Sequence, residues 1–163
     1  MKSDKRLSVG LSLPLAAVAG LLVLMFPAAG AQSEDSAAYG QLQKGKEVFL
    51  EECRKCHTIK YSLAESYSRD DWSLTVNMMV SNGAQLSDEQ KSLIIDYLSA
   101  KTAFETKCNV CHSLERPLSR TKTPEEWRST VNRMAGKRQG HLSAEEIEVI
   151  AAFLALGYPK PDK

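Results

Sequence analysis

The order of apolar and polar residues predicts an all-α chain. Apolar side chains recur at steps of three and four residues, which is the period of a helix that buries one face. No segment of the sequence shows the strict alternation expected of a half-buried strand. We predict a first helix from about Gln41 to Cys53, a second over residues 69–81 and a third that begins near Ser87.

The second half of the chain repeats this pattern. A shift of 55 positions superimposes many residues, and the match continues after a one-residue insertion. The superimposed residues include Phe49 on Phe104, Trp72 on Trp127, Thr75 on Thr130, Val76 on Val131, Met79 on Met134 and Tyr97 on Phe153. Such a repeat indicates two copies of one unit. We therefore divide the chain into an N-terminal segment, residues 1–31, and two units, residues 32–100 and 101–163.

Capping residues mark the starts of the predicted helices. The candidate N-caps are Ser68, Ser87, Thr123 and Ser143. Asn82-Gly83 is expected to end the second helix. No glycine or proline lies between Ser87 and Cys108, so we expect the third helix to continue into the second unit. The alternative is a break near residues 100–102.

Two pentapeptides carry the chemistry, Cys53-Arg54-Lys55-Cys56-His57 and Cys108-Asn109-Val110-Cys111-His112. Cys-x-x-Cys-His is the attachment signature of a c-type haem. Two thiols three positions apart reach the two vinyl groups of one porphyrin, and the imidazole that follows is a good iron ligand. All four cysteines of the chain lie in these motifs, which predicts two covalently attached haem c groups. The attachment sites are Cys53, Cys56, Cys108 and Cys111, and the iron ligands are His57 and His112.

Four cysteines could instead form two disulfides, one zinc site or two thioredoxin-like redox pairs. None of these uses requires the histidine that follows each pair. A zinc ribbon also repeats its cysteine pairs after roughly 15–20 residues, and the interval from Cys56 to Cys108 is much longer. Haem attachment accounts for the cysteines and the histidines together.

The N-terminal segment predicts export. Three basic residues precede an apolar run over residues 9–26, and Ala29-Gly30-Ala31 offers an A-x-A cleavage site. We interpret residues 1–31 as a signal peptide and place the mature start near Gln32. An uncleaved membrane anchor is the alternative, because the apolar run approaches the roughly 20 residues that span a bilayer. Haem attachment at such motifs takes place outside the bacterial cytoplasmic membrane, which agrees with a periplasmic location.

Charge is balanced overall but uneven along the chain. The sequence has 21 basic and 20 acidic residues, yet residues 32–99 carry a net charge of −4 and residues 100–163 a net charge of +3. The most basic stretch, residues 116–138, is either a solvated surface or a docking surface for an acidic redox partner. Export argues against a nucleic acid partner.

The second axial ligand of each iron must come from a short set of residues. The chain has three histidines and two lie in the motifs, so methionine must be considered as a ligand of at least one iron. Met79 and Met134 are the best candidates, because they superimpose in the repeat and each follows its motif histidine by 22 residues. Core packing is the commoner use of methionine, and His141 is an alternative ligand for the second iron. Trp72 and Trp127 either contact the porphyrin or its propionates or belong to the ordinary core.

The first unit resembles the small class I c-type cytochromes. In that family a glycine and an aromatic residue precede the haem cysteines, at the offsets of Gly45 and Phe49, and the first helix crosses an aromatic on the last helix, here Tyr97. The second unit keeps both aromatic positions but has Ala100 in place of the glycine. The resemblance implies an all-α fold of two tandem small cytochrome c-like haem modules, with about three helices each.

The run from Trp72 to Met79, followed by Leu86-Ser87 and Tyr97-Leu98, is similar to haem modules that accompany periplasmic dehydrogenases. These include the haem subunit of sulfite dehydrogenases and the haem domain of quinohaemoprotein amine dehydrogenases. We therefore expect a periplasmic dihaem cytochrome that transfers single electrons from a dehydrogenase to a cytochrome or oxidase and is not itself an enzyme. The alternatives are a haem enzyme or gas-binding sensor with one open iron, such as a small peroxidase, and an integral redox subunit.

Overall fold

The computed structural model describes residues 34–159, with side chains from residue 37 onward. Within these residues the chain has seven helices and no strand, so the predicted all-α class is confirmed. The helices are α1 (Glu34–Glu52), α2 (Lys60–Ala64), α3 (Arg69–Ser81), α4 (Asp88–Cys108), α5 (Glu115–Leu118), α6 (Pro124–Ala135) and α7 (Ala144–Leu156). The predicted signal peptide, residues 1–31, lies outside the described residues. None of the described helices is both long enough and apolar enough to cross a membrane.

The predicted caps begin four of the helices. The Ser68 hydroxyl accepts a hydrogen bond of 3.2 Å from the Asp71 N–H at the start of α3. Complete capping boxes start α4, α6 and α7, formed by Ser87 with Gln90, Thr123 with Glu126 and Ser143 with Glu146. After α3, Gly83 has a φ of 109°, a backbone conformation that favours glycine. The sequence therefore encodes these helix ends locally.

Helix α4 runs without a break from Asp88 to Cys108, over 21 residues. Its first half is the last helix of the first repeat, and its second half is the first helix of the second repeat. The predicted continuous helix is thus confirmed, and no break occurs near residues 100–102. At about 1.5 Å per residue, α4 spans roughly 30 Å.

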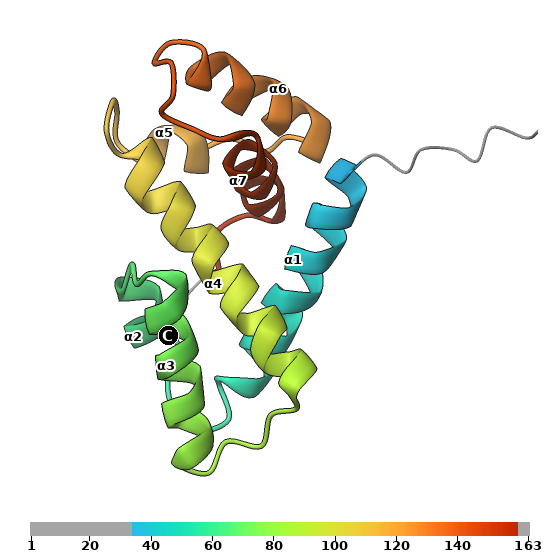
Figure 1. The fold of residues 1–163 in the computed structure, drawn as a ribbon, viewed down its shortest axis with the longest axis vertical. Coiled ribbons are helices and arrows are strands. Elements are labelled where there is room, and N and C mark those ends of the chain that lie inside the picture. Colours follow the sequence, from blue (N-terminus) through green and yellow to red (C-terminus); the bar gives the residue numbers. More distant parts are fainter. Residues whose placement is uncertain (1–33, 160–163) are drawn as a thin grey trace, which may run out of the picture. The chain divides into compact units, whose positions relative to one another are not determined.

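The helices of the two repeats pack in the same way (Figure 1). In the first repeat, α1 and α3 both pack against α4. In the second repeat, α4 and α6 both pack against α7. In neither repeat do the first two helices pack closely on each other. Helix α1 also packs against α7, so the two repeats share one core.

Four buried aromatic rings form a continuous row through this core. The ring centroids of Phe49 and Tyr97 lie 5.7 Å apart, those of Tyr97 and Phe153 5.6 Å, and those of Phe153 and Phe104 5.7 Å. All four side chains are 0% exposed. Tilted ring pairs at such distances each contribute roughly 0.5–1.5 kcal/mol beyond the area that they bury. Tyr97 lies at the crossing of α1 and α4, and Phe153 lies at the crossing of α4 and α7. The contact between the two rings therefore joins these crossings.

The crossing of α1 and α4 requires a residue without a side chain at Gly45. A Cβ at this position would lie 2.9 Å from the Cβ of Tyr97 and closer still to the Leu93 carbonyl oxygen. At the equivalent position of the second repeat, Ala100 is buried in the core. The second crossing therefore accommodates a methyl group where the first has no room for one.

Two short helices that the sequence pattern did not predict follow the motifs. Helix α2 has five residues and α5 has four. Before and within α2, Ile59 and Leu63 are buried in the core. After the second motif, Leu114 packs half-buried against the same core. These apolar residues fix the chain that leaves each motif.

Candidate functional site

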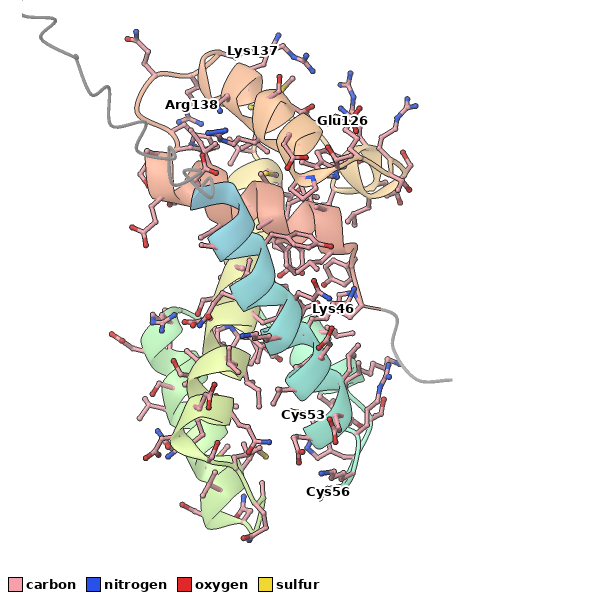
Figure 2. All side chains as sticks on the ribbon, turned by 90° about the vertical axis from the view of Figure 1, so that its right-hand side faces the viewer. Lys46, Cys53, Cys56, Glu126, Lys137 and Arg138 are labelled. Atoms are coloured by element: carbon pink, nitrogen blue, oxygen red, sulfur yellow. The ribbon has the colours of Figure 1, made fainter. Side chains whose placement is uncertain are left out.

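Both Cys-x-x-Cys-His motifs stand at the end of a core helix. Helix α1 ends at Glu52, and the Cys53 N–H continues it with a bond of 3.1 Å to the Phe49 carbonyl. Helix α4 ends at Cys108 itself. In both motifs the first cysteine is half-buried, and the second lies exposed on a turn. Figure 2 shows Cys53 and Cys56 at the C-terminal end of α1.

The two motif histidines make the same hydrogen bond. His57 Nδ1 lies 3.0 Å from the Thr58 carbonyl oxygen, and His112 Nδ1 lies 3.0 Å from the Ser113 carbonyl oxygen. A carbonyl oxygen only accepts, so Nδ1 is the protonated nitrogen of each ring. The lone pair of Nε2 is then available to a metal, with the ring held by its other nitrogen. The two rings are therefore in the tautomer that an iron ligand needs.

The four motif cysteines are free thiols. Burial raises the pKa of Cys53 to about 11, with the neighbouring Glu52 and Cys56 adding to the effect. Burial likewise raises the pKa of Cys108 to about 11, with a further contribution from Cys111. A thioredoxin-like thiol has a lowered pKa instead. Burial therefore disfavours the thiolate form of the first cysteine in each motif.

The two candidate methionines lie on helices that do not carry the motifs. Met79 on α3 is half-buried, and Met134 on α6 is 37% exposed. Beside them, the neighbour Met78 is 52% exposed. Helix α3 packs against α4 and not closely against α1, whose end carries the first motif. Helix α6 packs against α7 and not closely against α4, whose end carries the second motif. Each repeat thus carries its motif histidine and its candidate methionine on two separate segments.

The second repeat contains a buried indole N–H without an acceptor among the described residues. The Trp72 indole N–H donates to the Thr102 hydroxyl at 3.0 Å. The Trp127 indole nitrogen, in a side chain only 3% exposed, has no hydrogen-bond partner among the described residues. Buried N–H groups are rarely left without an acceptor. An acceptor on a bound group, such as a carboxylate, would satisfy this one.

His141 lies beside the second motif but is engaged by the backbone. Its Nε2 lies 2.9 Å from the carbonyl oxygen of Lys107, the residue before Cys108. Because a carbonyl oxygen only accepts, Nε2 carries the proton, and Nδ1 is the nitrogen that keeps its lone pair. The hydrogen bond satisfies one of the last carbonyls of α4.

The basic side chains of the second repeat gather around α5, α6 and the turn after α6. The exposed members without an ion-pair partner among the described residues are Arg116, Arg120, Arg133, Lys137 and Arg138. Arg128 instead pairs with Glu148 at 2.7 Å. Figure 2 shows Lys137 and Arg138 beyond the end of α6. The corresponding helix of the first repeat, α3, has only Arg69 as a basic residue, paired with Asp96.

One ionic group near the second motif was missed by the sequence prediction. Lys101 on α4 is 0% exposed and pairs with Glu105 at 2.8 Å. Lysine recurs at this place in both repeats, as Lys46 and Lys101. That recurrence at the 55-residue shift is the sequence signal that could have pointed to it.

No three His, Cys, Asp or Glu side chains among the described residues gather into a group that could hold a metal ion by themselves. Comparison of the chain with protein-family models, with curated proteins and with solved structures gave no match.

Proposed function

We propose that this chain is a periplasmic dihaem c-type cytochrome, made of two tandem cytochrome c-like modules at residues 32–100 and 101–163. The observation that carries the proposal is the recurrence of Cys-x-x-Cys-His at two equivalent helix ends, each with a histidine whose Nε2 is free to bind iron. Haem c, when bound, supplies an iron that gains and loses one electron. The chain's role is then to carry single electrons.

The residues that would hold each haem c come from one repeat. Cys53 and Cys56 would bind the first porphyrin, and His57 would bind its iron. In the second repeat Cys108, Cys111 and His112 have these roles. The backbone carbonyl on Nδ1 orients each imidazole and raises its basicity. Met79 and Met134 are the proposed second axial ligands, and histidine with methionine coordination favours electron transfer over ligand binding.

The proposed partners are redox proteins, a dehydrogenase as donor and a cytochrome or oxidase as acceptor. The second repeat carries the unpaired basic surface of α5, α6 and the following turn, whereas the first repeat is acidic overall. Opposite charge accelerates the encounter of two proteins. We infer that the two haems face different partners, and that the partner at the second repeat is acidic.

The first test is the number of haems on the chain. The full-length chain, produced in a periplasm with an active haem c maturation system, is expected to carry two covalent haems by intact mass and by its pyridine haemochrome spectrum. Replacing both cysteines of one motif, Cys53→Ala with Cys56→Ala, should leave one. A protein that matures without covalent haem would contradict the proposal. Sequencing of its N-terminus distinguishes cleavage near Gln32 from an uncleaved anchor.

The second test separates the electron carrier from a haem enzyme or gas-binding sensor. Ferric spectra with the methionine charge-transfer band in the near infrared, together with no carbon monoxide binding after reduction, are expected for an electron carrier. A high-spin ferric iron that binds carbon monoxide when reduced would favour the enzyme or sensor.

A further inference from the structure

Residues 58–66 form the exit segment of the first motif: they follow His57 directly and contain α2. At the start of this segment, the Thr58 carbonyl oxygen accepts the hydrogen bond from His57 Nδ1. Inside it, Ile59 is 0% exposed and Leu63 is 9% exposed. The orientation of the His57 ring therefore depends on where the exit segment lies.

The far end of the exit segment is bonded to the second repeat. Lys101 Nζ, on α4, donates to the Glu65 carbonyl oxygen at 2.7 Å. Glu65 is the C-cap of α2, where a helix leaves its carbonyls without partners. Lys101 is 0% exposed and is the only buried charged residue among those that the structure describes. A buried ammonium group is costly unless it is hydrogen-bonded, so this donor is committed to the acceptors around it.

Two more side chains of the second repeat take part. The Ser66 hydroxyl donates to Glu105 Oε2 at 2.7 Å, and Lys101 donates to the same oxygen at 2.8 Å. The Tyr158 hydroxyl, which follows α7, donates to Glu105 Oε1 at 2.5 Å and lies 3.3 Å from the Leu63 carbonyl oxygen. Burial raises the pKa of Tyr158, so its hydroxyl keeps its proton. Side chains from α4 and from the end of α7 thus hold the exit segment together.

The helix that leads into the first motif is bonded to the second repeat as well. Lys46 Nζ, on α1, donates to the carbonyl oxygens of Leu156, at 2.6 Å, and Gly157, at 3.0 Å. These two residues directly precede Tyr158. Figure 2 shows Lys46 on the same helix as Cys53. The first motif is therefore anchored to the second repeat on both sides, before its cysteines and after its histidine.

The exit from the second motif lacks the equivalent contacts. The 55-residue shift places Leu63 on Leu118, Glu65 on Arg120 and Ser66 on Thr121. Leu118 is 39% exposed, and both residues that replace Glu65 and Ser66 are exposed. Helix α5 itself has no buried residue. The exit of the second motif is thus far less buried than that of the first.

We propose that the second repeat positions the first iron ligand: Lys101 and Tyr158 hold the exit segment, and the exit segment holds His57 through the Thr58 carbonyl. This inference rests on the proposed function. The acceptor on the second ring nitrogen of an iron-binding imidazole sets its orientation and basicity. A shift of the Thr58 carbonyl therefore changes how His57 binds the first iron. Lys101 and Tyr158 are positioning residues, because they act on His57 only through the exit segment.

Electron paramagnetic resonance of the oxidised two-haem protein tests the proposal, because each low-spin iron gives its own g values. The variant with Cys53→Ala and Cys56→Ala, which would lack the first haem, identifies the signals of that haem. Lys101→Met and Tyr158→Phe are each expected to shift the g values of the first haem and to leave those of the second in place. Lys101 lies two helical turns before Cys108, so the signals of the second haem also report any direct effect on α4.

Hydrogen exchange of the same holoprotein, measured by mass spectrometry, reports the exit segment itself. Each hydrogen bond removed is expected to accelerate amide exchange over residues 58–66 about fivefold, and exchange over residues 113–121 should not change. Lys91→Met is the matched control. Lys91 is also on α4, but its ion pair, 2.6 Å long, is with Asp88 in the first turn of the helix. This variant should alter neither the g values nor the exchange of the exit segment.

The haem count keeps the possible failures distinguishable. A protein without two covalent haems contradicts the proposed function. Two haems whose g values are unchanged by Lys101→Met and Tyr158→Phe, or shift equally at both irons, would overturn the inference. Faster exchange over residues 58–66 without a spectral change would overturn it too, since the contacts would then hold the segment but not His57. If Lys101→Met does not fold, Tyr158→Phe and Ser66→Ala give the answer, because each removes a single hydroxyl.

Discussion

Replacing Gly45 by alanine tests the close approach of α1 and α4. Alanine gains up to about 1 kcal/mol in helix propensity over glycine. The added Cβ, however, would meet the backbone of Leu93 and the Cβ of Tyr97, neither of which can rotate away. Overpacking of this kind costs about 1–3 kcal/mol, and moving the helices apart weakens the contact between Phe49 and Tyr97, worth roughly 0.5–1.5 kcal/mol. We expect Gly45→Ala to lower the free energy of unfolding by about 2 kcal/mol.

The matched control lies in the same helix. Gly40 has nothing within 4 Å of the place that its Cβ would take, so Gly40→Ala should gain up to about 1 kcal/mol from propensity alone. Guanidinium unfolding of the haem-loaded proteins, followed by far-ultraviolet circular dichroism, compares the two variants. Their free energies of unfolding are comparable when both fall with guanidinium concentration at the same slope. A Gly45→Ala protein as stable as Gly40→Ala would refute the close crossing.

Three further predictions concern ligands, partners and pH. Met79→Ala and Met134→Ala should each remove about half of the near-infrared methionine band, since each leaves one iron without this ligand; an unchanged band would exclude the replaced residue as a ligand. Arg133→Glu with Lys137→Glu should slow electron transfer with an acidic partner and flatten its dependence on salt, and unchanged stopped-flow kinetics would exclude this docking surface. The Ser143 N–H, and then Lys107, lower the pKa of Glu146, so its ionised form stabilises the fold above its unfolded pKa and loses this effect as pH falls through the folded value. Glu146→Gln should therefore cost about 0.5–1 kcal/mol at pH 7, and this cost should disappear once the pH has fallen below the folded pKa, as measured by denaturant unfolding.

Local chemistry explains why much of the fold could be predicted. The N-caps at Ser68 and Ser87, and the absence of glycine and proline in α4, act on neighbouring residues and are visible in the sequence. Packing across the repeats was not predicted, because it joins residues far apart in the chain. The hydrogen bonds from Lys46 to the end of α7 are one example. Nothing local distinguishes Lys46 from an exposed lysine.

The candidate site shows the same division. The spacing of its cysteines and histidines is a property of the sequence, so the motifs could be read directly. The tautomer of His57 and the unpartnered N–H of Trp127 depend on neighbours that only folding supplies. Glu105 was missed for a similar reason, because a glutamate on a helix is ordinarily a solvated residue.

The helix shared by the repeats has a consequence for how this chain can evolve. The predicted boundary between residues 100 and 101 lies inside α4, and the ring of Tyr97 on one side of it contacts that of Phe153 on the other. Deleting either repeat would expose the buried aromatic rings of the repeat that remains and would remove half of α4. The two copies can therefore be inherited only as a pair, and each is free to diverge only where, as at Leu50 and Glu105, the common core allows it.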